Sequence, residues 1–218
     1  MGKTAIILGA SGLTGNILLK KLLADKRYDQ IKIFARKSIG ETSSKILEKE
    51  GDLLNLYDFK KDFNGDEVYC CIGTTSKKTP NRSLYKKIDY GIPVETARLS
   101  KENNIQTFIV ISSMGADPKS SIFYNRTKGE MEQTVLKEKI SHTYILRPSI
   151  IVGKRNEFRF AEQMGIKIMR FLQIFFIGKL KKYKVIEAEK IAQSMIHLAN
   201  SNEDQQIIES DKIQEIGK

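Results

Sequence analysis

The chain contains no tryptophan, only four prolines and only two cysteines among its 218 residues. The cysteines, Cys70 and Cys71, are adjacent, and neighbours on a strand point to opposite faces, so a disulfide between them has poor geometry. A secreted domain held together by disulfides is excluded, and both thiols are expected to be reduced. With no second cysteine pair, and with His142 and His197 isolated in the sequence, we predict no metal site.

Long apolar runs are also missing. No uninterrupted apolar stretch is long enough to span a bilayer, and the short apolar run near the amino terminus leads into glycines, unlike a signal peptide. Together with the reduced thiols, these features predict a cytoplasmic protein. There is no linker rich in proline or serine and no internal repeat, so the sequence predicts a single domain spanning residues 1–218.

Acidic residues are fewer than basic ones: the sequence has 26 aspartates and glutamates and 37 lysines and arginines, which gives a formal net charge of +11. Such a charge raises nucleic acid or an anionic membrane as a partner. The lysines, however, are spread along the whole chain, and no nucleic-acid-binding module is recognisable. We therefore expect solvated basic faces and no nucleic-acid partner, with a field that also favours an anionic cofactor or substrate.

What the sequence does contain is a regular alternation of apolar strand-length runs and helical patterns. The predicted strands are Thr4–Leu8, Ile31–Ala35, Lys45–Glu48, Val68–Ile72, Thr107–Ile111 and Thr143–Leu146. The clearest helical patterns are Leu13–Ala24, Leu84–Asn103 and Asn125–Lys139. Continuous apolar strands that alternate with helices are typical of a parallel sheet covered on both faces. The predicted fold class is therefore α/β, a Rossmann-type doubly wound parallel sheet.

The regular alternation of strand and helix patterns ends after Gly153. Two helices are predicted there, Phe158–Ile177 and Ala188–Ala199, and "QQIIES" is a candidate edge strand. These elements predict a small helical carboxyl-terminal lobe within about residues 154–218, on the substrate side of the same core. The stripe "MGIKIMRFLQIFFIGKLKKYK" combines apolar residues at helical spacing with lysines. Such spacing more often belongs to a core, a lid or a dimer face than to a membrane surface, so membrane contact is disfavoured and a homo-oligomer is left open.

Three glycines stand where the first predicted strand meets the first helix, in "GASGLTG". In dinucleotide-binding folds, glycines in this place allow a tight turn, a close approach of the backbone to the diphosphate, and close packing of helix on strand. The free N–H groups and the dipole of the helix start then hold the phosphates. We assign to this site Gly9, Ser11, Gly12, Leu13, Thr14 and Gly15. A P-loop is rejected because Asn16 stands where that motif needs lysine, and the alternative is glycines that serve packing alone.

The end of the second predicted strand indicates which dinucleotide binds. A site for NAD shows Asp or Glu about twenty residues after the glycines, where it accepts hydrogen bonds from the ribose 2′-OH. Here Arg36 and Lys37 occupy that place. A carboxylate would repel a 2′-phosphate, whereas a guanidinium binds it with two hydrogen bonds and can stack on adenine. The predicted cofactor is therefore NADP(H), with NAD(H) less favoured, and the alternative is an ordinary solvated basic turn.

Tyr124 and Lys128 stand four positions apart at the start of a predicted helix, which places both on one face. A nearby ammonium favours the phenolate form of a tyrosine. Such a pair can pass a proton to or from a carbonyl oxygen while hydride moves at carbon. Ser112 and Ser113 end the fifth predicted strand, at the sheet edge where ligands bind, and either could position the oxygen. The alternative is an amphipathic helix with a partly exposed tyrosine.

The order of these motifs resembles the short-chain dehydrogenase/reductase superfamily, in its extended or atypical branch. The segments "LGASGLTG", "CCIGTTSKK", "VISSMGADPKSSIFYNRTKGEME" and "ILRPSIIVG" are similar to the HIV Tat-interacting oxidoreductase-like proteins and related bacterial NAD(P)-binding proteins. The resemblance implies that Ser113 positions the substrate, Tyr124 is the acid/base and Lys128 holds the nicotinamide ribose. It further implies cofactor contacts at Asp52, Gly73, Thr74, Thr75 and Pro148.

These observations predict an NADP(H)-dependent oxidoreductase that transfers hydride to or from a small carbonyl or alcohol with a Ser–Tyr–Lys triad. The alternative is an NADP(H)-binding regulator or scaffold that senses redox state without turnover, because the resembled family also contains members that bind the cofactor mainly as regulators. The predicted partners are the nicotinamide dinucleotide and a small-molecule substrate whose identity the sequence leaves open.

Overall fold

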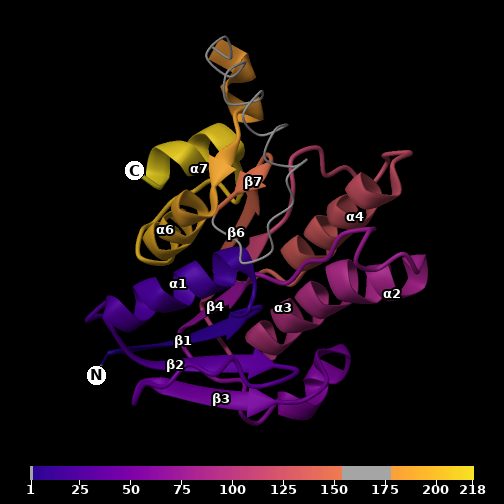
Figure 1. Ribbon diagram of the computed structural model, residues 1–218. Helices are drawn as coiled ribbons and strands as arrows, with labels where there is room; N and C mark the ends of the chain where they lie inside the picture. Colours follow the sequence, from indigo (N-terminus) through magenta and orange to yellow (C-terminus); the bar gives the residue numbers. More distant parts are fainter. Residues whose placement is uncertain (1, 154–177) are drawn as a thin grey trace.

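The fold is built on a parallel β-sheet (Figure 1). A computed structural model describes residues 2–153 and 178–218. Within these ranges, seven strands form one sheet in the order β3-β2-β1-β4-β5-β6-β9, and every neighbouring pair is parallel. The strands are β1 Lys3–Leu8, β2 Tyr28–Ala35, β3 Ile46–Glu50, β4 Glu67–Cys70, β5 Thr107–Ile111, β6 His142–Arg147 and β9 Ile207–Glu209.

The winding of the chain changes direction beside β1. From β1 the chain moves outward through β2 to β3, returns to β4 on the other side, and continues outward through β5 and β6 to β9. Because the strands are parallel, their carboxyl ends lie along one edge of the sheet. Ligands of doubly wound sheets bind at this edge, beside the boundary between the two halves. The predicted fold class, a doubly wound parallel sheet, is confirmed.

Helices cover both faces of this sheet (Figure 1). One face carries α1 Leu13–Ala24, α6 Ala188–Ala199 and α7 Ser210–Ile216. The other carries η1 Leu53–Phe59, α2 Arg82–Lys86, α3 Ile92–Glu102 and α4 Phe123–Lys137. Each face of the sheet has its own hydrophobic core: the first lies under α1 and α6, the second under α3 and α4. Because successive strand residues point to opposite faces, Ala5 and Ile7 of β1 belong to the first core, and Ile6 and Leu8 belong to the second.

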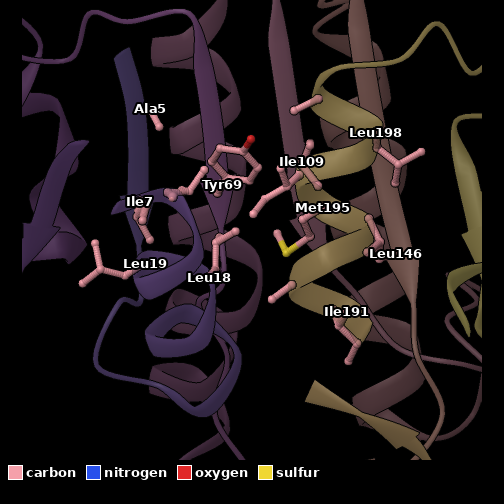
Figure 2. Packing of buried hydrophobic residues seen from close by; sticks show 14 of the residues in the cluster. Ala5, Ile7, Leu18, Leu19, Tyr69, Ile109, Leu146, Ile191, Met195 and Leu198 are labelled. Atoms are coloured by element: carbon pink, nitrogen blue, oxygen red, sulfur yellow. The ribbon is translucent and has the colours of Figure 1, made fainter. Parts of the chain in front are cut away.

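The first core fixes the position of α1 (Figure 2). Leu18 of α1 and Met195 of α6 lie in one fully buried cluster with Ile7, Tyr69 and Ile109 of the sheet. Burying a side chain of this kind stabilises the fold by about 1.5–3 kcal/mol. Because α1 is packed against both α6 and the sheet, its amino terminus is held at the carboxyl end of β1.

The helix predicted over Leu84–Asn103 is interrupted. After α2 the chain forms a π-helical segment, η2 Lys87–Gly91, before α3 begins. Pro93 explains the interruption, because proline has no N–H and its ring crowds the carbonyl oxygen four residues earlier. That carbonyl belongs to Asp89, in the middle of η2.

In the described part of the carboxyl-terminal third, one strand joins the main sheet and another forms a separate two-stranded sheet. β9 confirms the edge strand predicted in "QQIIES", while α7 after it was not predicted. A small parallel pair, β7 Ile151–Val152 and β8 Ile186–Glu187, and the helix η4 Gly178–Tyr183 complete this region.

The helix predicted over Phe158–Ile177 lies outside the described residues. Among the helices that the structure does describe, none is long and apolar enough to cross a membrane. The assignment of residues 154–218 to a substrate-side lobe of a single domain stays a prediction.

Candidate functional site

The turn between β1 and α1 requires two of its glycines. Gly9 has φ +85°, and a Cβ there would lie 2.8 Å from the carbonyl carbon of Cys71. A Cβ on Gly15 would lie 2.1 Å from the carbonyl oxygen of Gly9. The first glycine therefore permits the turn and the last lets α1 approach the end of β1, as the motif predicts.

The amino terminus of α1 has no side-chain cap. Gly12 occupies the cap position, its N–H donates to the Gly9 carbonyl at 3.0 Å, and no acidic residue lies in the first helical turn. Ser11 and Gly12 are exposed, and Thr14 is buried. Helix amino termini carry unpaired N–H groups and a positive partial charge, so this end is suited to an anion.

Two cations follow β2 without a partner. Arg36 and Lys37 are exposed, and neither side chain makes a hydrogen bond or ion pair with the described residues. The nearby acid is already engaged: Glu48 accepts from the Ser38 hydroxyl at 2.8 Å and from the Ile39 N–H at 2.7 Å. Since β2 lies beside β1 in the sheet, these free cations lie at the same edge as the glycine turn.

Asp52 follows β3 and caps η1. Its Oδ1 accepts the Leu54 N–H at 3.0 Å and its Oδ2 accepts from Asn55 Nδ2 at 3.3 Å. The side chain is therefore held in place at the carboxyl edge of the sheet. Its contact with adenine stays a prediction.

The loop after β4 lies close to η2 and α4. The Thr74 N–H donates to Asp89 Oδ2 at 2.8 Å, and the Thr74 hydroxyl lies 2.9 Å from that of Thr79. A Cβ on Gly73 would lie 3.6 Å from Asp89 Oδ1 and 3.9 Å from Lys128 Nζ. The structure thus brings the predicted residues Gly73 and Thr74 next to Lys128; Thr75 lies beside them in the exposed part of the loop.

Lys128 forms a buried ion pair that no motif predicted. Its Nζ lies 2.9 Å from Asp89 Oδ1, and the two side chains are only 4% and 1% exposed. Burial acts to lower the pKa of Lys128, but attraction to Asp89 and to Tyr124 outweighs it, so the pKa is raised overall. One signal in the sequence could have drawn attention to Asp89: it is the only acidic residue between Glu67 and Glu95, a stretch with five lysines and arginines before it.

The two candidate serines differ in their surroundings. The Ser112 hydroxyl donates to Glu132 Oε1, a carboxylate that also binds the guanidinium of Arg147 at 2.5 and 3.0 Å. The Ser113 hydroxyl is buried and has no hydrogen-bond partner in the described residues. Of the two serines that the sequence left open, only Ser113 has a hydroxyl free to bind a ligand.

A few buried polar atoms lack hydrogen bonds. Among the described residues, three buried side-chain atoms lack a hydrogen bond: Tyr85 Oη, Asp89 Oδ1 and Ser113 Oγ. Asp89 Oδ1 has ion-pair distance to Lys128 but no hydrogen-bond geometry. The Tyr85 ring lies edge-on to that of Tyr124, with centroids 6.4 Å apart. Buried polar groups normally have partners, so unpaired ones such as these are typical of residues that bind a ligand.

The last two predicted site residues are Tyr124, at the start of α4, and Pro148, just after β6. Tyr124 is partly exposed at the start of α4, one turn before Lys128. Pro148 is buried after β6, and its carbonyl accepts the Met114 N–H at 3.0 Å, which joins the loops after β5 and β6. Gly153 extends this connection, because a Cβ there would lie 3.0 Å from the side chain of Leu13 at the start of α1.

A doubly wound parallel sheet, with a glycine turn that brings a helix amino terminus to its central boundary, defines a Rossmann-type dinucleotide-binding protein. Residues 9–158 match a family model described as NAD(P)H-binding. The chain belongs to this NAD(P)H-binding family.

Two relatives illustrate the relationship. Protein FMP52, mitochondrial, of Candida albicans is 35% identical over 159 residues, which cover 71% of this chain and 69% of that protein. Protein HTATIP2 of Rattus norvegicus is 31% identical over 169 residues, which cover 76% of this chain and 69% of that protein. The family resemblance inferred from the motifs is thereby confirmed.

Solved structures share the fold at low identity. The enzyme WbmG of Bordetella bronchiseptica, in complex with NAD, has a TM-score of 0.71 and 10% identity, covering 95% of this chain and 72% of that one. The oxidoreductase ylbE of Lactococcus lactis has a TM-score of 0.58 and 20% identity, covering 70% and 71%. These likenesses support the Rossmann-type fold and do not choose between NAD and NADP.

The prediction of a cytoplasmic protein is wrong by the same comparison. Besides the Candida albicans relative, Protein FMP52, mitochondrial, of Meyerozyma guilliermondii is 34% identical over 154 residues. That match covers 69% of this chain and 66% of the relative, about two thirds of its length. The prediction failed because it relied on reduced cysteines, and free thiols do not separate the cytosol from another reducing compartment.

Proposed function

We propose that this protein is an NADP(H)-dependent oxidoreductase that transfers hydride to or from a small carbonyl or alcohol. The observation that carries the proposal is a set of buried polar side chains without hydrogen bonds among the described residues: Asp89 Oδ1, which lies beside Lys128, and Ser113 Oγ, which follows β5. Ser113 and the glycine turn both follow strands of the parallel sheet, so both lie at its carboxyl edge. A ligand in this position would contact the proposed catalytic groups and the dinucleotide together.

Each residue of the proposed triad has one task in reduction. The bound nicotinamide supplies hydride to the carbonyl carbon. The Ser113 hydroxyl donates a hydrogen bond to the carbonyl oxygen and so orients it, since this hydroxyl has no partner among the residues that the structure describes. Tyr124 gives its phenolic proton to the same oxygen as hydride arrives, which yields the alcohol. Lys128 holds the nicotinamide ribose and stabilises the tyrosinate that remains.

The remaining residues hold the dinucleotide. The diphosphate would lie against the amino terminus of α1, which no side chain of residues 2–153 or 178–218 caps. The residues proposed for this part of the site are Gly9, Ser11, Gly12, Leu13, Thr14 and Gly15. The residues proposed to contact the rest of the cofactor are Asp52, Gly73, Thr74, Thr75 and Pro148.

The preference for NADP(H) is proposed from Arg36 and Lys37. Both cations are exposed at the end of β2 and make no ion pair within the described part of the chain, so they are available to a 2′-phosphate. Arg36→Asp should lower the ratio of kcat/KM for NADPH over NADH by about tenfold or more, since the change removes one attractive charge and adds a repulsive one. Lys26→Asp makes a similar charge change before β2, at the opposite edge, and should leave the ratio unchanged.

The decisive test of the proposed reaction is Tyr124→Phe. Phenylalanine keeps the ring but not the proton, so turnover of carbonyl substrates should fall by roughly 10²–10⁴-fold while NADPH affinity stays within about threefold of wild type. Tyr57→Phe is the control, because Tyr57 is an exposed tyrosine of η1 whose hydroxyl accepts from Lys60, away from the proposed triad. Full turnover by Tyr124→Phe would disprove the assignment. Tight NADPH binding by a wild-type protein that oxidises none of it would support the redox-sensing alternative.

A further inference from the structure

Asp89 lies inside the proposed active site, although no motif includes it. Its side chain is fully buried and comes from η2, a π-helical segment. π-Helical turns are rare and occur frequently at functional sites. A buried carboxylate is expensive to desolvate unless it is paired and hydrogen-bonded, so its presence here calls for a specific role.

The Asp89 carboxylate contacts two elements of the site. Oδ2 accepts the backbone N–H of Thr74 at 2.8 Å, and Oδ1 contacts Lys128 Nζ at 2.9 Å. Thr74 belongs to the loop proposed to run along the cofactor, and Lys128 belongs to the helix that carries the catalytic tyrosine. A displacement of the Asp89 carboxylate would therefore move the loop and the lysine together.

Among the described residues, the charged and titratable groups that face Asp89 come from three elements: Lys128 from α4, Tyr85 from α2 and Cys70 from β4. Tyr124 of α4 acts on Lys128 and on Tyr85. Among the described residues, Lys128 is the cation paired with Asp89. Without the carboxylate, burial would act on the ammonium with little opposition, and Lys128 would lose its proton at a lower pH.

We propose that Asp89 is a positioning residue that acts through Lys128: it holds the ammonium in place for the nicotinamide ribose and keeps it charged. The inference rests on the proposed function, in which Lys128 binds the cofactor. It predicts that the loss of one buried negative charge changes how cofactor affinity depends on pH, an effect that a purely structural carboxylate would not have.

The test is the pH dependence of NADPH binding by Asp89→Asn, followed through the fluorescence of the bound dinucleotide. Asparagine keeps the size of the side chain and an oxygen that can accept from Thr74, but it removes the charge. Wild-type affinity should change by less than about threefold between about pH 7 and about pH 10. The affinity of the variant should weaken at least about tenfold in that range, because removal of an opposite charge this close shifts a titration by roughly 1–3 pH units.

Glu67→Gln is the matched control. Glu67 is also a buried carboxylate paired with a lysine, Lys3, but it lies at the start of β4, at the opposite edge of the sheet. This variant should lose stability and keep the pH dependence of the wild type. The inference is overturned if Asp89→Asn behaves in the same way. A wild-type protein that binds no NADPH at any pH overturns the proposed function instead.

If Asp89→Asn does not fold, the wild-type protein supplies the test. Lysines labelled with ¹³C at Cε report by NMR the protonation of each amine, and the Lys128 signal is identified by its loss in Lys128→Arg. The inference requires Lys128 to keep its proton to a higher pH than the exposed lysines do. Deprotonation of Lys128 before the exposed lysines overturns it.

Discussion

The buried tyrosines differ in whether their hydroxyl groups make hydrogen bonds, and this difference decides how each hydroxyl affects the stability of the fold. The hydroxyls of Tyr28 and Tyr69 donate to Glu67 at 2.8 and 2.6 Å, and this carboxylate is also paired with Lys3. Tyr85 is as deeply buried, but its hydroxyl faces the Asp89 carboxylate without completing a hydrogen bond to any described residue. The first arrangement compensates the loss of water around each hydroxyl, whereas the second leaves that loss uncompensated until a ligand enters.

Replacing the two kinds of tyrosine by phenylalanine should therefore have opposite effects on stability. Tyr85→Phe keeps the ring contacts with Phe123 and Tyr124 and removes an unpaired hydroxyl, so the free energy of unfolding should rise by about 1 kcal/mol. Tyr69→Phe removes one of the hydrogen-bond donors to Glu67, so the free energy of unfolding should fall by about 1–3 kcal/mol. Urea unfolding at neutral pH measures both. A loss of stability in Tyr85→Phe equal to that in Tyr69→Phe would mean that the Tyr85 hydroxyl has a partner.

Residues of the site differ in how far the sequence could predict them. Gly9 and Gly15 follow from a local pattern, because the turn and the helix that need them are contiguous in the chain, and both are confirmed as positions where a Cβ does not fit. Asp89 could not be predicted in the same way, because its partner Lys128 belongs to another helix. The choice between Ser112 and Ser113 likewise depended on Glu132, a carboxylate that is distant in sequence and adjacent in space.

Among the helices, the predictions succeeded where the helix has one clear periodic apolar face along its whole length. The bounds Leu13–Ala24 and Ala188–Ala199 agree with the structure because each helix has such a face, and these two faces pack against each other. The pattern over Leu84–Asn103 could not reveal the π-helical turn, because the apolar spacing continues through it. The short helix α7 was missed for the opposite reason, since its seven residues are too few for a clear period.

The same substitution at two glycines should show what the contact between α1 and β1 requires. In Gly15→Ala the new methyl group would meet the Gly9 carbonyl oxygen at 2.1 Å, so α1 must move away from β1. We expect a loss of about 3 kcal/mol or more in the free energy of unfolding, together with a loss of NADPH binding. In Gly91→Ala nothing lies closer than 4.0 Å and the backbone is helical, so stability should rise by roughly 0.5–1 kcal/mol. Equal effects of the two changes on unfolding would contradict this account.

For the molecule as a whole, the alternation of strands and helices predicted the architecture because parallel strands need crossover connections, and these are right-handed. The outermost strand was harder to place. β9 has only three residues and pairs with β6 from a distant part of the chain, so its pattern gives its type but not its neighbour. The cellular compartment could not be predicted for a different reason. Free cysteines indicate a reducing environment, but they do not identify the compartment that provides it.

The two cores also determine how the protein responds to alkali. Burial raises the pKa of Cys70 from 9.0 to about 11, and burial likewise raises the pKa values of Tyr28 and Tyr69. The native state therefore keeps protons that the unfolded chain releases. The stability that these groups contribute is complete below the unfolded pKa values and is lost as the pH rises toward the folded ones. For Cys70 alone, a difference of two pKa units corresponds to about 3 kcal/mol.

We thus expect the free energy of unfolding to be nearly constant from about pH 7 to about pH 8.5 and to fall steeply above about pH 9. Urea unfolding at a series of pH values measures this slope. Cys70→Ala removes one buried titrating group, so the variant should be less stable at neutral pH, from the lost packing, yet should lose less stability than the wild type between about pH 9 and about pH 11. Parallel curves for the two proteins across that range would show that the Cys70 thiol releases its proton as easily in the native state as in the unfolded chain.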